Sequence, residues 1–368
     1  MARRAAVIGA GIGGLATAVA LGRRGWRVTV YERRPTLAAL GAGLLVWPNA
    51  VHAVRALGLG ERLTAIGTRQ TVSGVRRADG RWLTRVDPAE IGRRLDAPLL
   101  AVARPDLHEV LLGGLADTVE IRTGLEVDPG DLPEADLVVA ADGIGSTTRA
   151  VLAPGTRVVD AGYVAWRAMV PTARVPAGVL AAETLGVGQR FGCAPITGHG
   201  VYWYATAPPP VRTSAPGDQL GELRERFLGW HEPIGALIAA TDPADLLHHG
   251  IGYLDPVPPL AFDRVALLGD AAHAMTPDIG QGAGLALEDA VTLASTLDGG
   301  DVAAGLARYD ALRRPRVTAL VRRARSVGRL LQAAGPVGVL LRDLMIVATP
   351  ARVTVAAGVR TADWRPPR

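Results

Sequence analysis

The chain has 368 residues, 49% of them hydrophobic, and is long enough to bury a sizeable core in one large or two closely packed domains. All 40 basic residues are arginines set among 35 acids, giving a net charge of +5, and no aromatic platform is interleaved with them, so nucleic-acid binding is not expected. The single cysteine, Cys193, excludes an intrachain disulfide and a cysteine-built metal cage, and favours a reducing, cytoplasmic compartment.

The first thirty-two residues predict a strand, a glycine turn, a helix and a second strand that ends in an acid. Gly9 permits a tight turn after the strand, Gly11 permits close approach of the backbone to a pyrophosphate, and Gly14 permits close packing of the helix on the sheet. The phosphates are then expected at the helix N-terminus, with Glu32 accepting hydrogen bonds from an adenosine ribose.

Two arginines followed by an apolar run also resemble a secretory signal peptide. Signal peptides do not place glycines at dinucleotide spacing and continue directly into a strand. We therefore expect this segment to remain in the mature protein.

The next part of the chain predicts further elements of a nucleotide-binding unit. They are a glycine-rich approach from Gly41 followed by an apolar strand that stops at Pro48, helix 50–57, a hairpin in 71–86 around Asp79-Gly80, and strand 99–103. A helix opened by Arg104-Pro105-Asp106 and strands 119–127 and 136–143 follow. Strand 136–143 is apolar and ends in an acid and a glycine, just as the first strand of the chain is apolar and ends in glycines.

From Tyr163 the pattern changes to strands without intervening helices, which predicts an antiparallel sheet. These strands are expected at 163–170, 179–185, 190–194 and 201–207, followed by one helix at 217–240. An apolar strand at 264–270, a glycine-rich loop and a helix at 285–297 then return to the first unit, and the remainder is helical. The pattern predicts a nucleotide-binding domain of 1–70, 98–160 and 258–368, and a sheet domain of 71–97 and 161–257.

Three features are expected to be structural. The arginines of 313–316 and 322–325 are expected on the exposed face of a helix. The apolar run 336–348 is too short to cross a bilayer and includes Arg342-Asp343, so we expect it to pack on the body of the protein. The histidines are dispersed, and His248-His249 is expected at the surface, so no metal site is predicted.

Three strand ends together resemble the class A flavoprotein monooxygenases, the single-component FAD-dependent aromatic hydroxylases, over nearly the whole chain. The motifs are Gly9 to Gly14 with Glu32, Ala140-Ala-Asp-Gly-Ile-Gly-Ser-Thr-Thr-Arg149, and Gly269-Asp-Ala-Ala-His-Ala-Met-Thr-Pro-Asp-Ile-Gly-Gln-Gly282. The smaller members, of urate-hydroxylase and salicylate-hydroxylase type, are the most similar. The resemblance implies an α/β fold: a Rossmann-like FAD-binding domain with an inserted antiparallel-sheet substrate domain and a helical C-terminus.

The resemblance also implies which residues contact the cofactor. Asp270 accepts a hydrogen bond from a ribityl hydroxyl, Arg104 lies near the ribityl and pyrophosphate groups, and the backbone of Val127 contacts adenine. Asp142 belongs to a motif associated with FAD and transient NAD(P)H docking, although a structural role is the alternative. Arg33 is an adenine-stacking or surface residue. The whole expected set is Gly9, Gly11, Gly13, Gly14, Glu32, Arg33, Gly43, Arg104, Val127, Asp142, Asp270, Pro277, Gly280, Gln281, Gly282 and Ala283.

The family mechanism implies tightly bound FAD, reduction by NADPH or NADH, and addition of O2 at flavin C4a to give a hydroperoxide that hydroxylates or epoxidises an aromatic or polycyclic substrate. Arg190 and Tyr202 occupy the positions at which urate-hydroxylase relatives place a substrate-contacting Arg and Tyr. The alternative for both is an ordinary exposed sheet face. We expect small-molecule partners only, no nucleic acid, no membrane insertion, and a monomer or homodimer.

Rival interpretations remain. A flavin-dependent halogenase is disfavoured, because the family requires an active-site lysine and this chain has none. A flavin-dependent reductase of the same fold, or a non-catalytic flavin-binding redox sensor, stays open.

Overall fold

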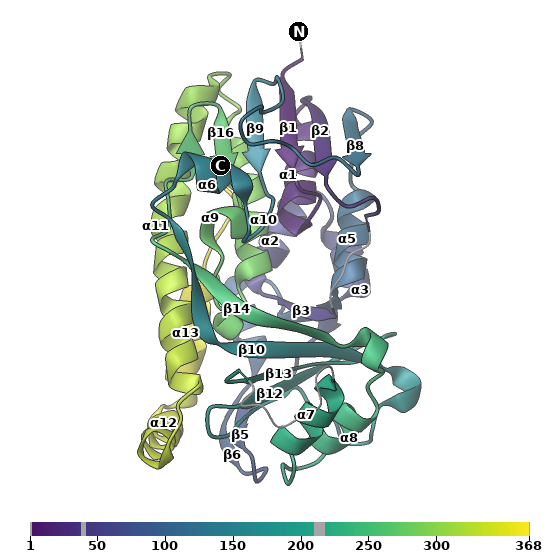
Figure 1. Cartoon of the computed structure of the whole chain (residues 1–368), viewed down its shortest axis with the longest axis vertical. Helices are drawn as coiled ribbons and strands as arrows, with labels where there is room; N and C mark the ends of the chain where they lie inside the picture. The colour runs from purple at the N-terminus through teal and green to yellow at the C-terminus, as the bar shows by residue number, and fades with distance from the viewer. Residues whose placement is uncertain (1, 38–41, 210–217, 368) are drawn as a thin grey trace.

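The computed structural model describes residues 2–37, 42–209 and 218–367. In these ranges the strands form a six-stranded, a seven-stranded and a three-stranded sheet, with a column of helices along one side (Figure 1). Gly41, which begins the glycine-rich approach to a strand, and Gly217, where a helix is expected to begin, lie outside the described residues.

The six-stranded sheet is the nucleotide-binding sheet predicted from the glycine and acid motifs. Its order is β15 (Ala261–Phe262), β16 (Val265–Leu267), β9 (Leu137–Ala140), β1 (Arg4–Ile8), β2 (Arg27–Glu32) and β8 (Val119–Thr123). All neighbours are parallel except β15 and β16. Because parallel strands end at one edge, Gly9, Glu32, Asp142 and Asp270 come together there, although they are far apart in the sequence.

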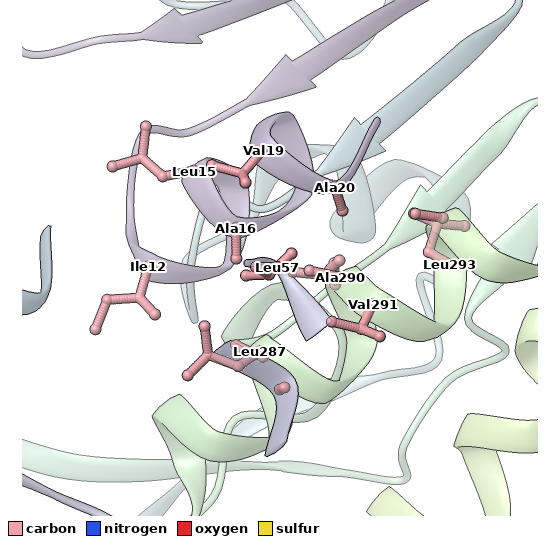
Figure 2. Close-up of a cluster of buried hydrophobic side chains, with 14 of the residues drawn as sticks. Ile12, Leu15, Ala16, Val19, Ala20, Leu57, Leu287, Ala290, Val291 and Leu293 are labelled. Carbon is pink, nitrogen blue, oxygen red and sulfur yellow. The ribbon is translucent and has the colours of Figure 1, made fainter. Parts of the chain in front are cut away.

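Helices α1 (Ile12–Gly22) and α10 (Gly282–Thr296) pack together on this sheet (Figure 2). Ala16 and Ala20 of α1 lie on the side that faces Leu57 and Ala290 of α10 (Figure 2). A Cβ atom at Gly13 would lie 2.6 Å from the Leu268 side chain and 3.2 Å from Ala286. Small residues therefore permit the close approach of the helix to its neighbours.

A small sheet links the two larger ones. It consists of β3 (Gly43–Val46), β7 (Leu100–Ala103) and β4 (Thr68–Arg69), all antiparallel. Its helical neighbours are α2 (Pro48–Ala56), α3 (Gly60–Ile66) and α5 (Arg104–Leu112). As predicted, Pro105 occupies the first turn of α5, where its missing N–H costs no intrahelical bond.

The seven-stranded sheet runs β14 (Leu247–Asp255), β10 (Arg157–Pro171), β13 (Gly200–Ala207), β12 (Arg190–Ile196), β11 (Ala182–Leu185), β5 (Ser73–Arg77) and β6 (Trp82–Val86). The predicted antiparallel pairing is confirmed, with one difference: β5 joins β11 in parallel. One face is buried under α7 (Gln219–Arg226) and α8 (Ile234–Ala239) around Trp166, Phe191 and Trp203. The opposite face meets β3 and β7 through Tyr202 and Ala194.

The single helix predicted at 217–240 is wrong in the described part, which holds two short helices. Gly229, with a φ of 76°, and Pro233, which lacks an N–H, separate α7 from α8. The sheet takes strands from both segments assigned to the substrate domain, 71–97 and 161–257, and β10 begins slightly earlier, at Arg157. The exact domain boundaries stay a prediction.

The C-terminal part is helical, as expected, with α11 (Val302–Leu331), α12 (Pro336–Ala348) and α13 (Ala351–Ala362). Helices α4 (Pro88–Leu95), α6 (Thr147–Leu152) and α9 (Asp270–His273) complete the described set. The arginine cluster is only partly on an exposed face: Arg314 and Arg322 are exposed as expected, but Arg313 is 1% exposed and buried in an ion-pair network. Helix α12 packs on β6, as expected, although its apolar side chains face outward. None of the described helices is by itself long and apolar enough to cross a membrane.

Candidate active site

A cavity opens at the carboxyl edge of the six-stranded sheet. Its wall includes backbone from the ends of β1, β2 and β9 and side chains from α5. The predicted cofactor residues that line it are Gly9, Gly11, Glu32, Arg33, Arg104, Val127 and Asp142. Residues distant in sequence are thus assembled as the motifs predicted.

The glycines at this edge have two different functions. Gly9 has a φ of +102°, and a Cβ atom there would lie 2.5 Å from the Ala141 carbonyl oxygen; a Cβ atom at Gly14 would lie 1.9 Å from that of Gly9. Both are therefore required by packing. A Cβ atom at Gly11 would have no described protein atom within 4 Å. Gly11 borders open space, as expected of a position where the protein backbone approaches a ligand.

The acids at this edge are differently engaged. Glu32 accepts hydrogen bonds from the backbone N–H groups of Ala10 (2.9 Å) and Arg34 (3.0 Å), which hold the glycine turn against β2. The Oδ1 atom of Asp142 is buried and has no hydrogen-bond partner among the described residues. A buried carboxylate oxygen without a donor is costly, so this atom requires a donor from a ligand or water.

A second group of predicted residues lies on the loop between β16 and α10. Pro277–Ile279 forms a single helical turn, Gly280 follows with a φ of +61°, and α10 begins at Gly282 without a side-chain cap. The Gln281 side chain is 1% exposed; its Oε1 accepts from Asn49 Nδ2 at 2.8 Å, and its Nε2 has no partner among the described residues. Free N–H groups at the start of a helix attract negative charge.

A buried ion-pair network fixes this loop from beneath. Glu288 accepts from Asn49 (2.6 Å) and Arg316 (2.8 Å), while Asp289 accepts from Arg313 (2.7 Å) and from the backbone N–H of Gly269 (3.1 Å). Burial raises the pKa of Asp289, but the charges of His273 and Arg313 outweigh this effect and lower it to about 2. The network therefore fixes Gly269, which precedes Asp270, and it fixes Gln281 through Asn49.

Arg104 connects the cofactor edge to the seven-stranded sheet. Its backbone N–H donates to the Ala42 carbonyl at 3.1 Å. Burial lowers its pKa, while the nearby Asp270 carboxylate raises it and the Arg167 guanidinium lowers it. Arg104 thus lines the cavity at the cofactor edge and directly follows β7, which packs on the inward face of the seven-stranded sheet.

Tyr202 lies on the sheet face that looks toward this edge. A Cβ atom at Gly43 would lie 2.6 Å from the Tyr202 ring, so the ring packs directly on β3 and excludes any side chain there. Burial raises the pKa of Tyr202, whereas Arg167 and Arg104 lower it. The pKa of His249 is lowered to about 4, mainly by partial burial of the imidazole and further by the charges of Arg167, His248 and Arg104. This side of the site is electropositive.

Arg190 differs from both sequence-based interpretations. Its side chain is 2% exposed, so it is not part of an open sheet face. The guanidinium pairs with Asp278 through Nη1 and with Glu183 through Nε at 2.9 Å, and so it is already bound to two carboxylates. Burial lowers the pKa of Arg190, but Glu183, Tyr204 and Asp278 outweigh it and raise the pKa.

Sequence reasoning missed the partners of Arg190. Asp278 is fully buried and also accepts from the Tyr163 hydroxyl at 2.9 Å, and Glu183 accepts from Tyr204 at 2.7 Å. Asp278 lies within the quoted Gly269–Gly282 motif, between two residues assigned to the cofactor, and that position was the available signal. The network joins the 277–283 loop to the seven-stranded sheet.

The described residues fit an FAD molecule. Gly11 leaves room for the pyrophosphate, α1 and α10 both start without a side-chain cap, and Asp142 Oδ1 and Gln281 Nε2 need polar partners. Among the described residues no group of three or more His, Cys, Asp or Glu is placed to hold a metal ion.

Comparisons with known proteins agree with this arrangement. Residues 133–324 match the family described as FAD binding domain, and residues 7–43 match the NAD(P)-binding Rossmann-like domain. The chain is 33% identical to aurachin C monooxygenase/isomerase of Stigmatella aurantiaca, over 89% of each chain, and 35% identical to FAD-dependent urate hydroxylase of Klebsiella pneumoniae, over 88% of each. A crystal structure of Klebsiella pneumoniae HpxO with FAD and uric acid superposes with a TM-score of 0.87 at 31% identity, covering 98% of this chain and 96% of that one.

Proposed function

The chain belongs to the class A FAD-dependent aromatic hydroxylases and is an FAD-dependent monooxygenase; from this premise we propose that its substrate is an aromatic ring bearing an anionic oxygen or carboxylate. We place this substrate between the inward face of the seven-stranded sheet and the 277–283 loop, with NADPH or NADH as electron donor. The observation that carries the proposal is the position of Arg104: it lines the cofactor cavity and follows β7, which packs on the sheet face that carries Tyr202 and Arg167.

Bound FAD supplies the activation of O2 and the transfer of one oxygen atom, and the protein supplies binding, orientation and exclusion of water. Gly9, Gly11 and the start of α1 would hold the pyrophosphate. The N-terminus of α10, which has no side-chain cap, would stabilise the negative charge that the flavin gains on reduction. The ion pairs of Glu288 and Asp289 keep that N-terminus in position.

On the substrate side, Tyr202 is the proposed hydrogen-bonding residue. Its pKa is raised by burial, so the hydroxyl keeps its proton and donates to an anionic substrate oxygen. Arg167, which forms no ion pair with any described residue, supplies a positive charge beside it. Arg190 acts through Asp278 as a positioning residue, in place of the direct substrate contact expected from the sequence.

The names of the relatives support an anionic aromatic substrate. They include urate hydroxylase, 3-amino-4-hydroxybenzoate 2-monooxygenase and 6-hydroxynicotinate 3-monooxygenase. We further propose that the protein works in the cytoplasm, in keeping with its single cysteine, as a monomer or homodimer.

The test is NAD(P)H oxidation by the FAD-loaded protein across phenols, quinolones, purines and polycyclic aromatics, with mass analysis of each reaction. A compound that accelerates oxidation and gains one oxygen atom supports the proposal and identifies the substrate class. Matched pairs of neutral and anionic ring compounds test the charge preference separately. Bound FAD without oxidation of NAD(P)H under any compound contradicts the proposal and favours the sensor or reductase alternative.

A further inference from the structure

Helix α12 has the reverse of the polarity expected for a helix on a protein surface. Its two charged residues face inward: Arg342 is 1% exposed and donates to the Gly186 carbonyl at 2.7 Å, and Asp343 pairs with Arg77 at 3.1 Å. The large apolar side chains face solvent with exposures of 53–68%: Val337, Leu340, Leu341, Leu344, Met345 and Val347. Surface helices normally bury such a face, so this one requires a partner outside the chain.

The surface around α12 is basic. The helix packs on β6, and α13 packs on β6 as well. The elements β5, β6 and α13 carry Arg76, Arg85, Arg352 and Arg360, besides Arg77, whose charge is neutralised by Asp343 of α12. They contain no acidic residue themselves, and Asp79 lies in the turn between β5 and β6.

A hollow on α13 adds to this pattern. It is lined by Arg94, Arg352 and Arg360 together with Val353, Ala356 and Val359. Of these arginines, Arg94 pairs with Glu90, while Arg352 and Arg360 form no ion pair with any described residue. The hollow thus combines positive charges with apolar walls on α13, the helix that follows α12 along the chain.

We propose that α12 docks flat on an anionic lipid bilayer, with its outer apolar face in the headgroup region and the arginines of α13 and β6 on lipid phosphates. The helix has 13 residues and is about 20 Å long, too short to cross a bilayer but long enough to lie at its surface. Apolar burial and attraction between arginines and anionic headgroups then act together. In Figure 1, α12 lies at the lower end of the molecule, away from the six-stranded sheet.

A second copy of the chain fits this surface less well. In a twofold contact the same patch meets itself, so the net positive charge around α12 would be brought against the same charge on the other copy. Like charges brought together at an interface are unfavourable, whereas an anionic bilayer neutralises them. The charge pattern therefore favours lipid.

The experiment is flotation of the FAD-loaded full chain with vesicles of phosphatidylcholine alone or phosphatidylcholine with phosphatidylglycerol. We expect binding to the mixed vesicles, weakened by salt, and little binding to the neutral ones. The double variant Leu340→Gln/Leu344→Gln should lower the partition coefficient at least about tenfold, because several buried CH2 groups are lost. The double variant Arg352→Gln/Arg360→Gln should remove most of the salt dependence.

The matched control is Leu312→Gln, which changes a leucine that is 51% exposed on the part of α11 that contacts the six-stranded sheet, and it should leave vesicle binding unchanged. Retained FAD absorbance and melting temperature verify that each variant is folded. The inference is overturned if the wild type does not float with anionic vesicles, or if the α12 variant floats equally well. Concentration-dependent dimerisation that the α12 variant abolishes, without vesicle binding, would assign the surface to a second copy.

Discussion

The buried pair between Arg190 and Asp278 gives the sharpest prediction about stability. In Asp278→Asn, the shape is kept and the negative charge is removed, so the guanidinium of Arg190, 2% exposed, loses one of its two carboxylates. Breaking a buried ion pair from one side typically costs about 3–5 kcal/mol. Because Glu183 still pairs with Arg190 at 2.9 Å, we expect the lower end, about 3 kcal/mol.

The assay is calorimetric melting of FAD-free protein. An unfolding entropy of about 2 cal/mol/K per residue converts this loss into a melting temperature lower by about 4 °C. The control is Asp298→Asn, which breaks the exposed pair with Arg24 and should cost under about 1 kcal/mol. If Asp278→Asn costs no more than Asp298→Asn, the pair does not support the fold and the positioning role of Arg190 is refuted.

Three further predictions concern the cofactor edge, the ion-pair network and the substrate side. Gly11→Val should weaken FAD binding without changing the stability of the FAD-free protein, because a Cβ atom there meets no described protein atom within 4 Å. Gly14→Val should instead destabilise the fold itself. An FAD affinity of Gly11→Val equal to that of the wild type contradicts the assignment. The pKa of Asp289 is lower in the folded state (about 2) than in the unfolded state (3.8). Its contribution of about 2 kcal/mol to the free energy of unfolding is therefore present above pH 4 and is lost as the pH falls toward 2. Urea unfolding at about pH 5 and about pH 3 should therefore show a smaller difference between wild type and Asp289→Asn at the lower pH, and a constant difference would refute the shift. Tyr202→Phe should raise the KM for an anionic substrate about fivefold, because one hydrogen bond is lost, and should leave FAD affinity unchanged. An unaltered KM removes Tyr202 from the site.

The cofactor half of the site was predictable from sequence because its signals are local. A glycine that follows an apolar strand, or an acid at a strand end, is constrained by the turn beside it. Parallel pairing then brings Gly9, Glu32 and Asp142 to one edge without any knowledge of side-chain contacts. The hairpin around Asp79-Gly80 was recognised for the same reason.

The substrate half was less predictable because its contacts are distant in sequence. Arg190 and Asp278 are 88 residues apart, and no periodicity indicates that β12 places one against the other. The orientation of α12 was also beyond reach. Its sequence contains an apolar face and a charged pair, and only the backbone course and the Arg77 pairing decide which side is buried.

The strand order of the six-stranded sheet has a consequence for synthesis on the ribosome. Strands β1, β2 and β9 emerge early, but β16, which pairs with β9, and α10, which packs on α1, emerge only after the whole seven-stranded sheet has been translated. At bacterial or eukaryotic elongation rates of about 5–20 residues per second, this interval lasts on the order of ten seconds or more. During it α5 is already available to pack on α1, but the part of α1 that contacts α10 is uncovered, and the 277–283 loop that completes the proposed cofactor site has not yet been made.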